Sequence, residues 1–250
     1  MRLLNTYTLE VEEFQADFPE YVILSHTWGG EEVTLRDLQS PAASTKKGFT
    51  KLKRCCEKAA SDGFHYVWID TCCIDKTSSA ELSESINSMY QWYKGSYICY
   101  VYLADFTITP GSSALDNENF ARARWWTRGW TLQELLAPVT VEFYDSNWVE
   151  YGTKVSLREQ ITKVSGIDEA ILRGENPLRR NVAVRMSWAA HRNTTRIEDQ
   201  AYCLLGLFGV NMPLLYGEGE RAFGRLQEEI MRVREDYTLF AWLWGHSTTH

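Results

Sequence analysis

The stretch YVILSHTWGG, residues 21–30, gives the first indication of the fold. Its first five residues form an apolar run that polar residues and two glycines bring to an end. Short apolar runs of this kind are typical of strands buried on both faces. Further along the chain, similar runs alternate with segments whose apolar residues recur every three or four positions. This alternation predicts strands joined by crossover helices, and therefore an α/β fold with a parallel sheet of the flavodoxin-like kind.

The individual elements follow from the same two periodicities. Strands are predicted at residues 21–25, 65–74, 96–106 and 140–148, and helices at residues 48–63, 78–95 and 128–138. In the second helix, Ser78 or Ser79 is suited to cap the first turn. Its buried stripe is predicted from helical spacing to contain Leu82, Ile86, Met89 and Tyr93. Ligands of open parallel sheets bind beyond the carboxyl ends of the strands, so polar residues that follow each strand are site candidates.

The sequence divides into two parts with different character. Residues 1–148 are predicted to form the α/β core. Residues 149–250 contain helical patterns joined by Gly, Pro and Asn, and are predicted to form a mostly helical extension. The clearest of these patterns are at residues 155–166, 183–192, 198–209 and 219–236.

Composition excludes several classes of function. The chain has 250 residues, of which 44% are hydrophobic and 24% charged, as in ordinary globular proteins. Its net charge of −7 argues against a nucleic-acid-binding protein, which needs a basic face. The N-terminus lacks the apolar segment of a signal peptide, and no apolar run approaches the length that spans a bilayer. We therefore expect a cytoplasmic protein without membrane contact.

The cysteine pattern predicts neither a metal site nor disulfides. Six cysteines are present, but their spacing matches no common metal-ligand motif. They lie in apolar segments, where a free thiol behaves as a small buried hydrophobe. Ser25 and His26 have the chemistry of a nucleophile and a base. As neighbours on a strand they point to opposite faces, which argues against a catalytic pair.

A carboxylate in RGWTLQELLAP, residues 128–138, is a stronger candidate. Trp130 and Glu134 are four residues apart and share one face of the predicted helix. An indole beside a carboxylate suits a cationic, ring-bearing substrate, because the ring stacks and the anion stabilises positive charge. Glu81, which also opens a helix near the same sheet edge, is the reserve candidate. The simpler interpretation of each carboxylate is helix capping or solvent exposure.

A dense charged set lies in the helical extension, and it allows two interpretations. It is expected to form salt bridges that join the extension to the sheet. Alternatively, Arg192 or Arg196 contacts a diphosphate. The other members of the set are His191, Glu198 and Asp199.

Several motifs together resemble one family, the fungal heterokaryon incompatibility (HET) domain. They are YVILSHTWG, WIDTCCIDK, SINSMYQWY and RGWTLQELLAP, in the order that the family uses. The later run from RMSWAAHRNTTRIEDQ to LQEEI resembles the subgroup in which this domain precedes a nucleotide-binding module and WD repeats. The resemblance implies a domain that triggers cell death when genetically different hyphae fuse, or in a related immune response.

A more distant resemblance to TIR domains suggests a mechanism. WTLQEL, residues 130–135, resembles the WCLxEL of plant-type TIR helices, whose glutamate supports NAD+ cleavage. That resemblance implies Glu134 as the catalytic carboxylate and Trp130 as part of the pocket wall. It also implies that residues of two loops contact the nucleotide: Ser25, His26, Thr27, Trp28, Gly29 and, as a sugar contact, Asp70. Thr131 stands where those helices have cysteine, and the loop after the second strand lacks the TIR glycine pattern.

Two functions are consistent with these motifs. In the first, the domain is an NAD+ glycohydrolase that acts when clustered in a homo-oligomer, with NAD+ as substrate and with no cofactor or metal. In the second, it is a non-enzymatic module that self-associates and recruits death-inducing partners. Nicotinamide release that depends on Glu134 distinguishes the two.

Overall fold

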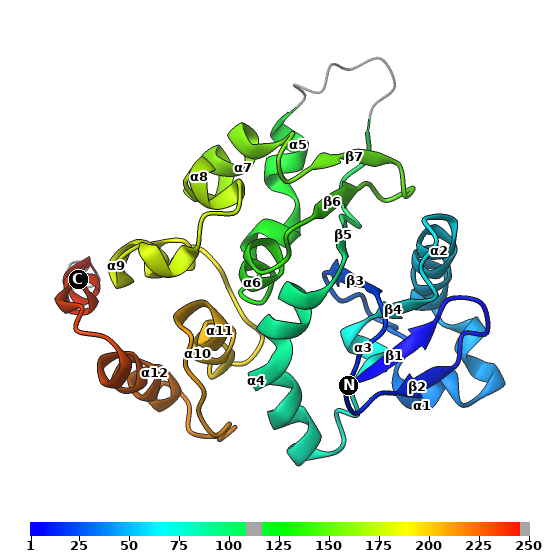
Figure 1. Cartoon of the computed structure of the whole chain (residues 1–250), viewed down its shortest axis with the longest axis horizontal. Helices are drawn as coiled ribbons and strands as arrows, with labels where there is room; N and C mark the ends of the chain where they lie inside the picture. The colour runs from blue at the N-terminus through cyan, green and yellow to red at the C-terminus, as the bar shows by residue number, and fades with distance from the viewer. Residues whose placement is uncertain (109–116, 246–250) are drawn as a thin grey trace.

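A seven-stranded sheet forms the centre of the molecule in the computed structural model, which describes residues 1–108 and 117–245 (Figure 1). Its strand order is β2-β1-β4-β3-β5-β6-β7. The strands are β1 (Arg2–Asn5), β2 (Val11–Glu13), β3 (Tyr21–His26), β4 (Tyr66–Trp68), β5 (Ile98–Tyr102), β6 (Val141–Tyr144) and β7 (Glu150–Thr153). The four central strands pair in parallel. Along the chain their spatial order is 2-1-3-4, the beginning of the flavodoxin-like order, and the α/β prediction is confirmed.

The sheet also contains antiparallel strands on both sides of its parallel centre, which the sequence analysis does not predict. β1 pairs antiparallel with β4 and with β2, and β7 pairs antiparallel with β6. The strands β1, β2 and β7 have three or four residues each and carry many polar side chains, so they lack the apolar runs that mark buried strands. Because β7 follows residue 148, the sheet continues past the predicted end of the α/β core.

The second predicted strand is also shorter than expected. β4 ends at Trp68, and residues 70–73 form the short helix α3 (Asp70–Cys73). The carbonyl oxygen of Ile69 accepts hydrogen bonds from the backbone N–H groups of Cys72 and Cys73, which begins the helical turn. Apolar side chains alone do not separate a buried strand from a buried helical turn. The result matters for the site, because α3 starts with Asp70.

Helices cover both faces of the sheet. Figure 1 shows α2 (Lys47–Ser61) on one side, and α4 (Ser79–Gly95) and α6 (Thr131–Leu136) on the other. Ser78 caps α4 by accepting a hydrogen bond from the N–H of Glu81, as predicted. The predicted stripe of α4 faces inward: Ile86, Met89 and Tyr93 are buried, and Leu82 is partly buried. The remaining helices of this part are α1 (Leu35–Leu38), α5 (Asn117–Arg122), η1 (Pro41–Thr45) and η2 (Arg124–Thr127).

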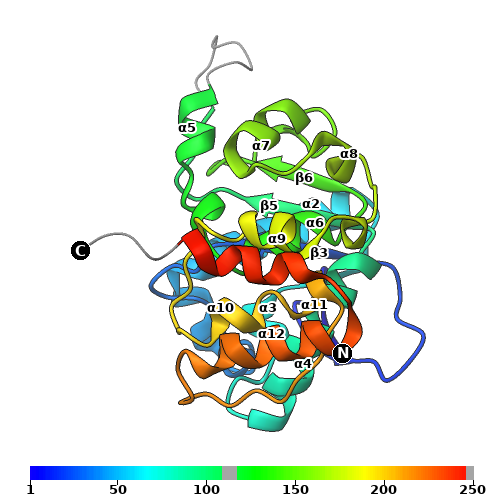
Figure 2. The same cartoon turned by 90° about the vertical axis from the view of Figure 1, so that its left-hand side faces the viewer.

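The extension is mostly helical, as predicted, and it packs against the helices of the core. Figure 2 shows α9 to α12 lying in front of the sheet. At the closest approach, Gly206 of α11 lies against Tyr90 of α4. The helices of the extension are α7 (Arg158–Ser165), α8 (Glu169–Leu172), α9 (Val182–Ser187), α10 (Asp199–Tyr202), α11 (Leu205–Phe208) and α12 (Arg221–Val233), with η3 (Pro177–Arg179) and η4 (Tyr237–Gly245).

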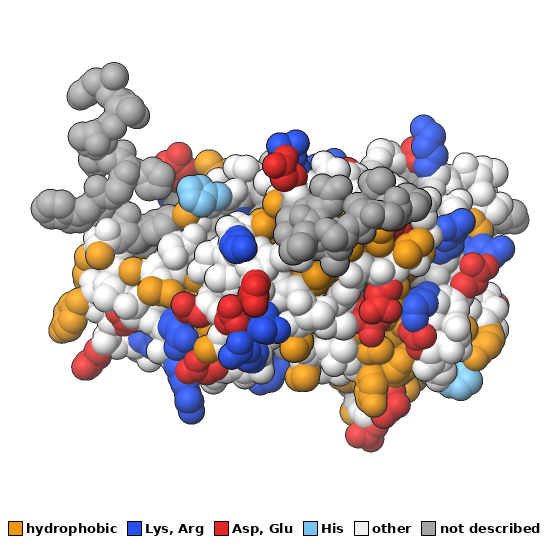
Figure 3. Space-filling view, turned by 90° about the horizontal axis from the view of Figure 1, so that it is seen from above, with side chains coloured by type: hydrophobic (Ala, Val, Ile, Leu, Met, Phe, Trp, Pro, Cys, Tyr) orange, Lys and Arg blue, Asp and Glu red, His pale blue; other side chains and the backbone are white. Residues whose placement is uncertain are grey.

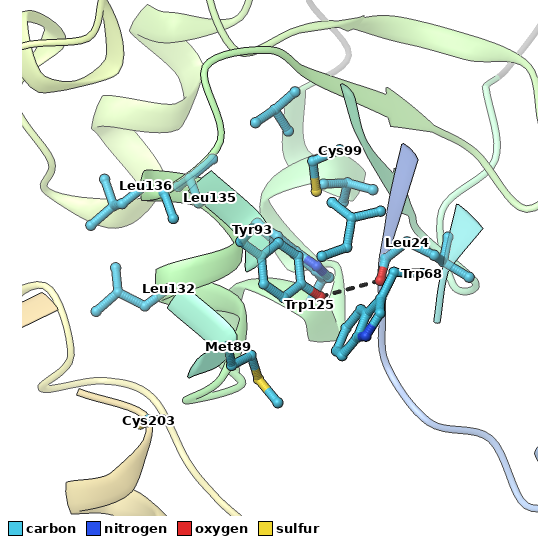
Figure 4. Close-up of a cluster of buried hydrophobic side chains, with 14 of the residues drawn as sticks. Leu24, Trp68, Met89, Tyr93, Cys99, Trp125, Leu132, Leu135, Leu136 and Cys203 are labelled. Carbon is cyan, nitrogen blue, oxygen red and sulfur yellow. Dashed lines mark hydrogen bonds between the residues drawn. The ribbon is translucent and has the colours of Figure 1, made fainter. Parts of the chain in front are cut away.

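The core lies between the sheet and α4 and α6 (Figure 4). There the hydroxyl of Tyr93 donates a hydrogen bond to the backbone oxygen of Leu24, 3.2 Å away, within a cluster of buried hydrophobic side chains. All six cysteines are buried free thiols, in agreement with the prediction. In the described part of the chain, no helix has the length and apolar character needed to cross a membrane. On the face in Figure 3, acidic and basic side chains are interspersed.

Candidate functional site

A cavity of about 320 Å³ opens at the carboxyl ends of β3 and β4. This is the sheet edge at which ligands of open α/β sheets bind, and the volume is within the range of small-molecule sites. Five segments line the cavity: the end of β3 with its loop (Leu24, His26, Thr27, Trp28), the segment at α3 (Asp70, Ile74, Lys76), α4 (Leu82, Ile86, Met89, Tyr93), α6 and the turn before it (Arg128, Trp130, Thr131, Glu134), and the extension (Thr195, Arg196, Asp199, Tyr216).

Glu134 lies on the buried floor of this cavity, with 7% of its surface exposed. Burial raises the pKa of this carboxyl to about 8, and the nearby Asp70 contributes to the rise. The hydrogen bond from Ser25, the neighbouring Tyr93 hydroxyl and the charge of Arg192 act in the opposite direction. A carboxyl group in a cavity whose pKa is raised into the physiological range is typical of a functional acid or base.

A directed chain of hydrogen bonds reaches Glu134 from beneath. The indole N–H of Trp125 donates to Oγ of Ser25, 2.8 Å away, and the Ser25 hydroxyl donates to Oε2 of Glu134. An indole nitrogen can only donate, so the Ser25 oxygen is occupied as an acceptor and its proton is free to point at the carboxylate. Trp125 and Ser25 are fully buried, which fixes the orientation of the chain.

His26 is a buried side chain of the cavity wall whose two ring nitrogens have no hydrogen-bond partner. Its Nε2 lies 3.9 Å from an oxygen of Asp70 and 3.9 Å from an oxygen of Glu32, beyond hydrogen-bond range. Burial lowers the pKa of His26 well below its usual value, and Lys51 adds to the effect, so the ring is neutral at pH 7. An unpaired buried polar group costs about 1–3 kcal/mol, so this imidazole is a candidate contact for a bound hydroxyl or amide.

Trp28, Asp70 and Lys76 form a connected group at the cavity mouth. The indole N–H of Trp28 donates to Asp70 over 3.0 Å, and Nζ of Lys76 lies 3.6 Å from the centre of the Trp28 ring. Nζ of Lys76 is also 3.4 Å from the Asp70 carboxylate. Trp28 remains 52% exposed, so one aromatic face is held in place beside the entrance while staying accessible to a ligand.

Most of the residues predicted for the site lie at the cavity. His26, Thr27, Trp28, Asp70, Trp130 and Glu134 line it. Ser25 instead lies under the floor, bonded to Glu134, and Gly29 lies outside, where its N–H donates to Glu32.

The reserve carboxylate Glu81 points away from the cavity. It pairs with Arg2 and accepts a 2.7 Å hydrogen bond from the N–H of Asp75. This contact explains Glu81 as a structural residue that ties α4 to the first strand.

The charged set of the extension does not form the expected salt-bridge network. Arg192 is buried and donates to the backbone oxygens of Trp188 and Arg128 and to the hydroxyl of Thr131. Glu198 accepts from the backbone N–H groups of Gly217 and Gly219. Hydrogen bonds with backbone groups therefore stabilise the charges of Arg192 and Glu198, in place of the expected salt bridges. Only Arg196 and Asp199 of this set reach the cavity.

Several cavity residues were not singled out from the sequence as site residues. Tyr93 was assigned only to the core, and Arg128, Thr195 and Tyr216 received no role. The last two lie in the extension and reach the sheet edge through a tertiary contact: Arg128 and Asn193 form a parallel bridge, with the Gly129 N–H bonded to the Asn193 oxygen at 2.9 Å. A Cβ on Gly129 would lie 2.5 Å from a side-chain methyl of Thr194, so a larger residue there would force this contact to shift.

Comparisons with known proteins give two family models and a named relative that match the chain. Residues 21–119 match the model of the heterokaryon incompatibility protein (HET) family, and residues 221–250 match that of a domain of unknown function. The chain is 47% identical over 218 residues to the vegetative incompatibility protein HET-E-1 of Podospora anserina. That alignment covers 85% of this chain but 16% of the relative. No solved structure gives a significant match.

The segment that the family model matches includes part of the cavity lining, but not Glu134. The family model covers β3, α3 and α4, and the alignment with the relative extends over most of the chain. An identity of 47% over such a length means that the chain belongs to the heterokaryon incompatibility (HET) family.

Proposed function

We propose that this chain is a cell-death effector domain of fungal incompatibility, and that it acts by cleaving NAD+ at the nicotinamide–ribose bond. Family membership and the printed name of the relative support the first half. One observation carries the second half: the Glu134 carboxyl lies at the floor of a cavity, beside Trp130 and above a hydrogen-bond chain directed at it. The resemblance of residues 130–135 to the TIR helix motif points to the same residue.

The reaction needs few protein groups. The bond between C1′ of the ribose and the nicotinamide nitrogen breaks, and its electron pair goes to that nitrogen. The cationic ring leaves as neutral nicotinamide, so no general acid is required. The ionised Glu134 stabilises the positive charge that develops on the ribose, as one carboxylate does in a glycosidase. Water then adds to C1′ and loses a proton, which gives ADP-ribose.

The surrounding groups fit a nucleoside. The neutral His26 has free ring nitrogens for sugar or amide contacts. Ile86 and Met89 supply an apolar wall, and Trp130 an aromatic one. A cationic ring next to Glu134 favours the ionised carboxylate, because an opposite charge lowers the pKa of an acid. Substrate binding therefore prepares the catalytic form of the acid.

The decisive experiment measures nicotinamide release by the purified chain, first alone and then fused to an oligomerising tag. Wild type is expected to release nicotinamide, and Glu134→Gln to lose about 10²–10³ in rate. Glu84→Gln is the matched control, because Glu84 is an exposed residue of α4. Circular dichroism must show that each variant is folded. No release by clustered wild-type chain, or equal release by Glu134→Gln, would overturn the proposal.

A second function, a self-associating module without catalysis, is favoured by exposed apolar side chains near the cavity mouth. Trp28, Ile197 and Leu215 are 52%, 45% and 53% exposed. In that case Glu134→Gln would still kill cells, whereas charged substitutions at Ile197 and Leu215 would abolish killing. In the full-length protein, the family resemblance suggests a following nucleotide-binding module and WD repeats as the source of clustering.

A further inference from the structure

We infer that Arg128 and Arg196 form a diphosphate-binding site at the mouth of the cavity, and that the substrate class is therefore a nucleoside diphosphate or dinucleotide rather than a nucleoside or mononucleotide. The role of this site in NAD+ cleavage rests on the proposed function, whereas the binding of a diphosphate does not. It assigns half of the ligand site to the extension, which the sequence pattern presents only as a helical addition to the sheet.

The two arginines lie close together in the cavity lining, and each is held in place by a contact with a neighbouring side chain. Arg128 precedes α6, and its guanidinium donates to the Thr195 hydroxyl over 3.1 Å. Arg196 follows Thr195, and its guanidinium carbon lies 4.4 Å from the centre of the Tyr216 ring. All four residues line the cavity. The guanidinium groups are thus ordered before a ligand arrives, which lowers the entropic cost of binding.

Both guanidinium groups keep donors available for an anion. In the described part of the chain, neither has a carboxylate oxygen within ion-pair distance. Arg196 is exposed and Arg128 is partly buried, so both can reach a ligand at the entrance. Planar guanidinium groups bind phosphate oxygens with paired hydrogen bonds.

A buried clamp fixes the backbone beneath this site. Arg192 donates from one nitrogen to the Arg128 oxygen at 3.0 Å and to the Thr131 hydroxyl at 2.8 Å. The Tyr216 hydroxyl donates to Asp199 over 2.9 Å, which orients the ring under Arg196. Removing either support is expected to weaken binding less than removing a guanidinium.

The charged groups at the floor and at the mouth of the cavity suit a ligand with a cationic ring at one end and phosphates at the other. The floor carries Glu134 and neutral His26, which suit a cationic ring and its sugar. The mouth also carries Asp70, which is paired with Lys76, and Asp199, which accepts from Tyr216. Among the described residues, the guanidinium groups of Arg128 and Arg196 have no such acidic partner and suit two phosphates, and the exposed face of Trp28 offers a stacking surface for a base.

Isothermal titration with ADP, AMP and adenosine tests the inference without any catalysis. Wild type is expected to bind ADP more tightly than AMP, and AMP more tightly than adenosine. Arg128→Gln and Arg196→Gln should each weaken ADP binding about tenfold or more and leave adenosine binding nearly unchanged. Arg122→Gln is the matched control, since Arg122 is an exposed arginine of α5 paired with Glu118. Tyr216→Leu, which keeps both charges, should give a smaller loss than Arg196→Gln.

The outcomes separate this inference from the proposed reaction. Absence of ADP binding by wild type, or equal ADP affinity in wild type and both arginine variants, would overturn the diphosphate site even if NAD+ is cleaved. ADP binding that requires both arginines, together with no NAD+ cleavage by clustered chain, would support the site and overturn the reaction.

Discussion

The Ser25 hydroxyl donates a hydrogen bond to the carboxylate of Glu134, although 109 residues separate them in the sequence. Ser25 belongs to β3, the first parallel strand, and Glu134 to the helix that follows β5. Trp125 holds the Ser25 oxygen from below. The bond therefore joins three parts of the fold at the point where the proposed chemistry takes place, and it leads to a direct prediction about charge.

Replacing Trp125 with Phe should raise the pKa that governs catalysis. The donor chain stabilises the ionised Glu134, and Phe removes its first donor while keeping an aromatic ring. In wild type, kcat/KM should rise with pH and level off above about 8, because the ionised acid is the active form. In Trp125→Phe the midpoint should move to higher pH, with a several-fold lower rate at pH 7 and a smaller loss at pH 9.

The control for this prediction is Trp148→Phe. Trp148 also has a buried indole nitrogen, but that nitrogen has no partner, and the residue does not line the cavity. Its variant should keep the wild-type midpoint. A Trp125→Phe profile that is lower at every pH by one factor, with an unmoved midpoint, would mean that Trp125 only supports the fold.

Glu134→Gln should change stability in a pH-dependent way. Because the folded-state pKa of about 8 is above the usual 4.5, the folded protein holds its proton more tightly than the unfolded chain. That contribution is complete below pH 4.5 and is lost as pH rises to about 8. Glutamine has no proton to lose, so it should become the more stable variant by a few kcal/mol at pH 8 relative to pH 5.

Urea unfolding of both proteins at pH 5 and pH 8 measures this difference. Other titrating groups are the same in the two chains, so their effects cancel in the comparison. A difference in unfolding free energy that is equal at the two pH values would show that Glu134 titrates normally.

The sequence predicts the centre of the fold well because buried strands and amphipathic helices leave strong patterns. YVILS is β3, and the stripe of α4 from Leu82 to Tyr93 faces the cavity as well as the core. The strands β1, β2 and β7 are not predicted because they are short and rich in polar residues, so they leave no apolar run in the sequence. The turn at Asp70 was read as strand because its apolar cysteines continue the pattern of β4.

The sequence predicts those site residues that lie within one element, but not the contacts between elements that are far apart in the chain. Trp130 and Glu134 share a helix, so their spacing alone places them together. The contacts of Arg128 with Thr195, and of Ser25 with Trp125, link segments that local patterns cannot connect. Glu81 and Glu134 look alike in sequence, since each lies in the first turn of a helix. Only the tertiary structure separates them, by giving Glu81 a partner in Arg2.

Glu81→Gln should therefore affect stability and not the reaction. It removes the charge that pairs with Arg2 and weakens the contact with the Asp75 N–H. Because the pair is partly exposed, a loss of about 1 kcal/mol or less in unfolding free energy is expected. Nicotinamide release should stay within twofold of wild type. A loss of activity as large as that of Glu134→Gln, in a folded protein, would move the catalytic assignment to Glu81.

Substitutions at two glycines of the extension, Gly206 and Gly224, test how tightly the extension packs on the core. At Gly206 of α11, an added Cβ would lie 2.1 Å from Cβ of Tyr90, so α11 or α4 must shift. Gly206→Ala should cost about 1–3 kcal/mol in unfolding free energy, as overpacking does. Gly224 in α12 has open space around it, so Gly224→Ala should stabilise the chain by about 0.5–1 kcal/mol through helix propensity. Thermal unfolding of the two variants beside wild type measures both effects. An unchanged melting temperature for Gly206→Ala would contradict the contact between α11 and α4, and a lower one for Gly224→Ala would contradict the open space around Gly224.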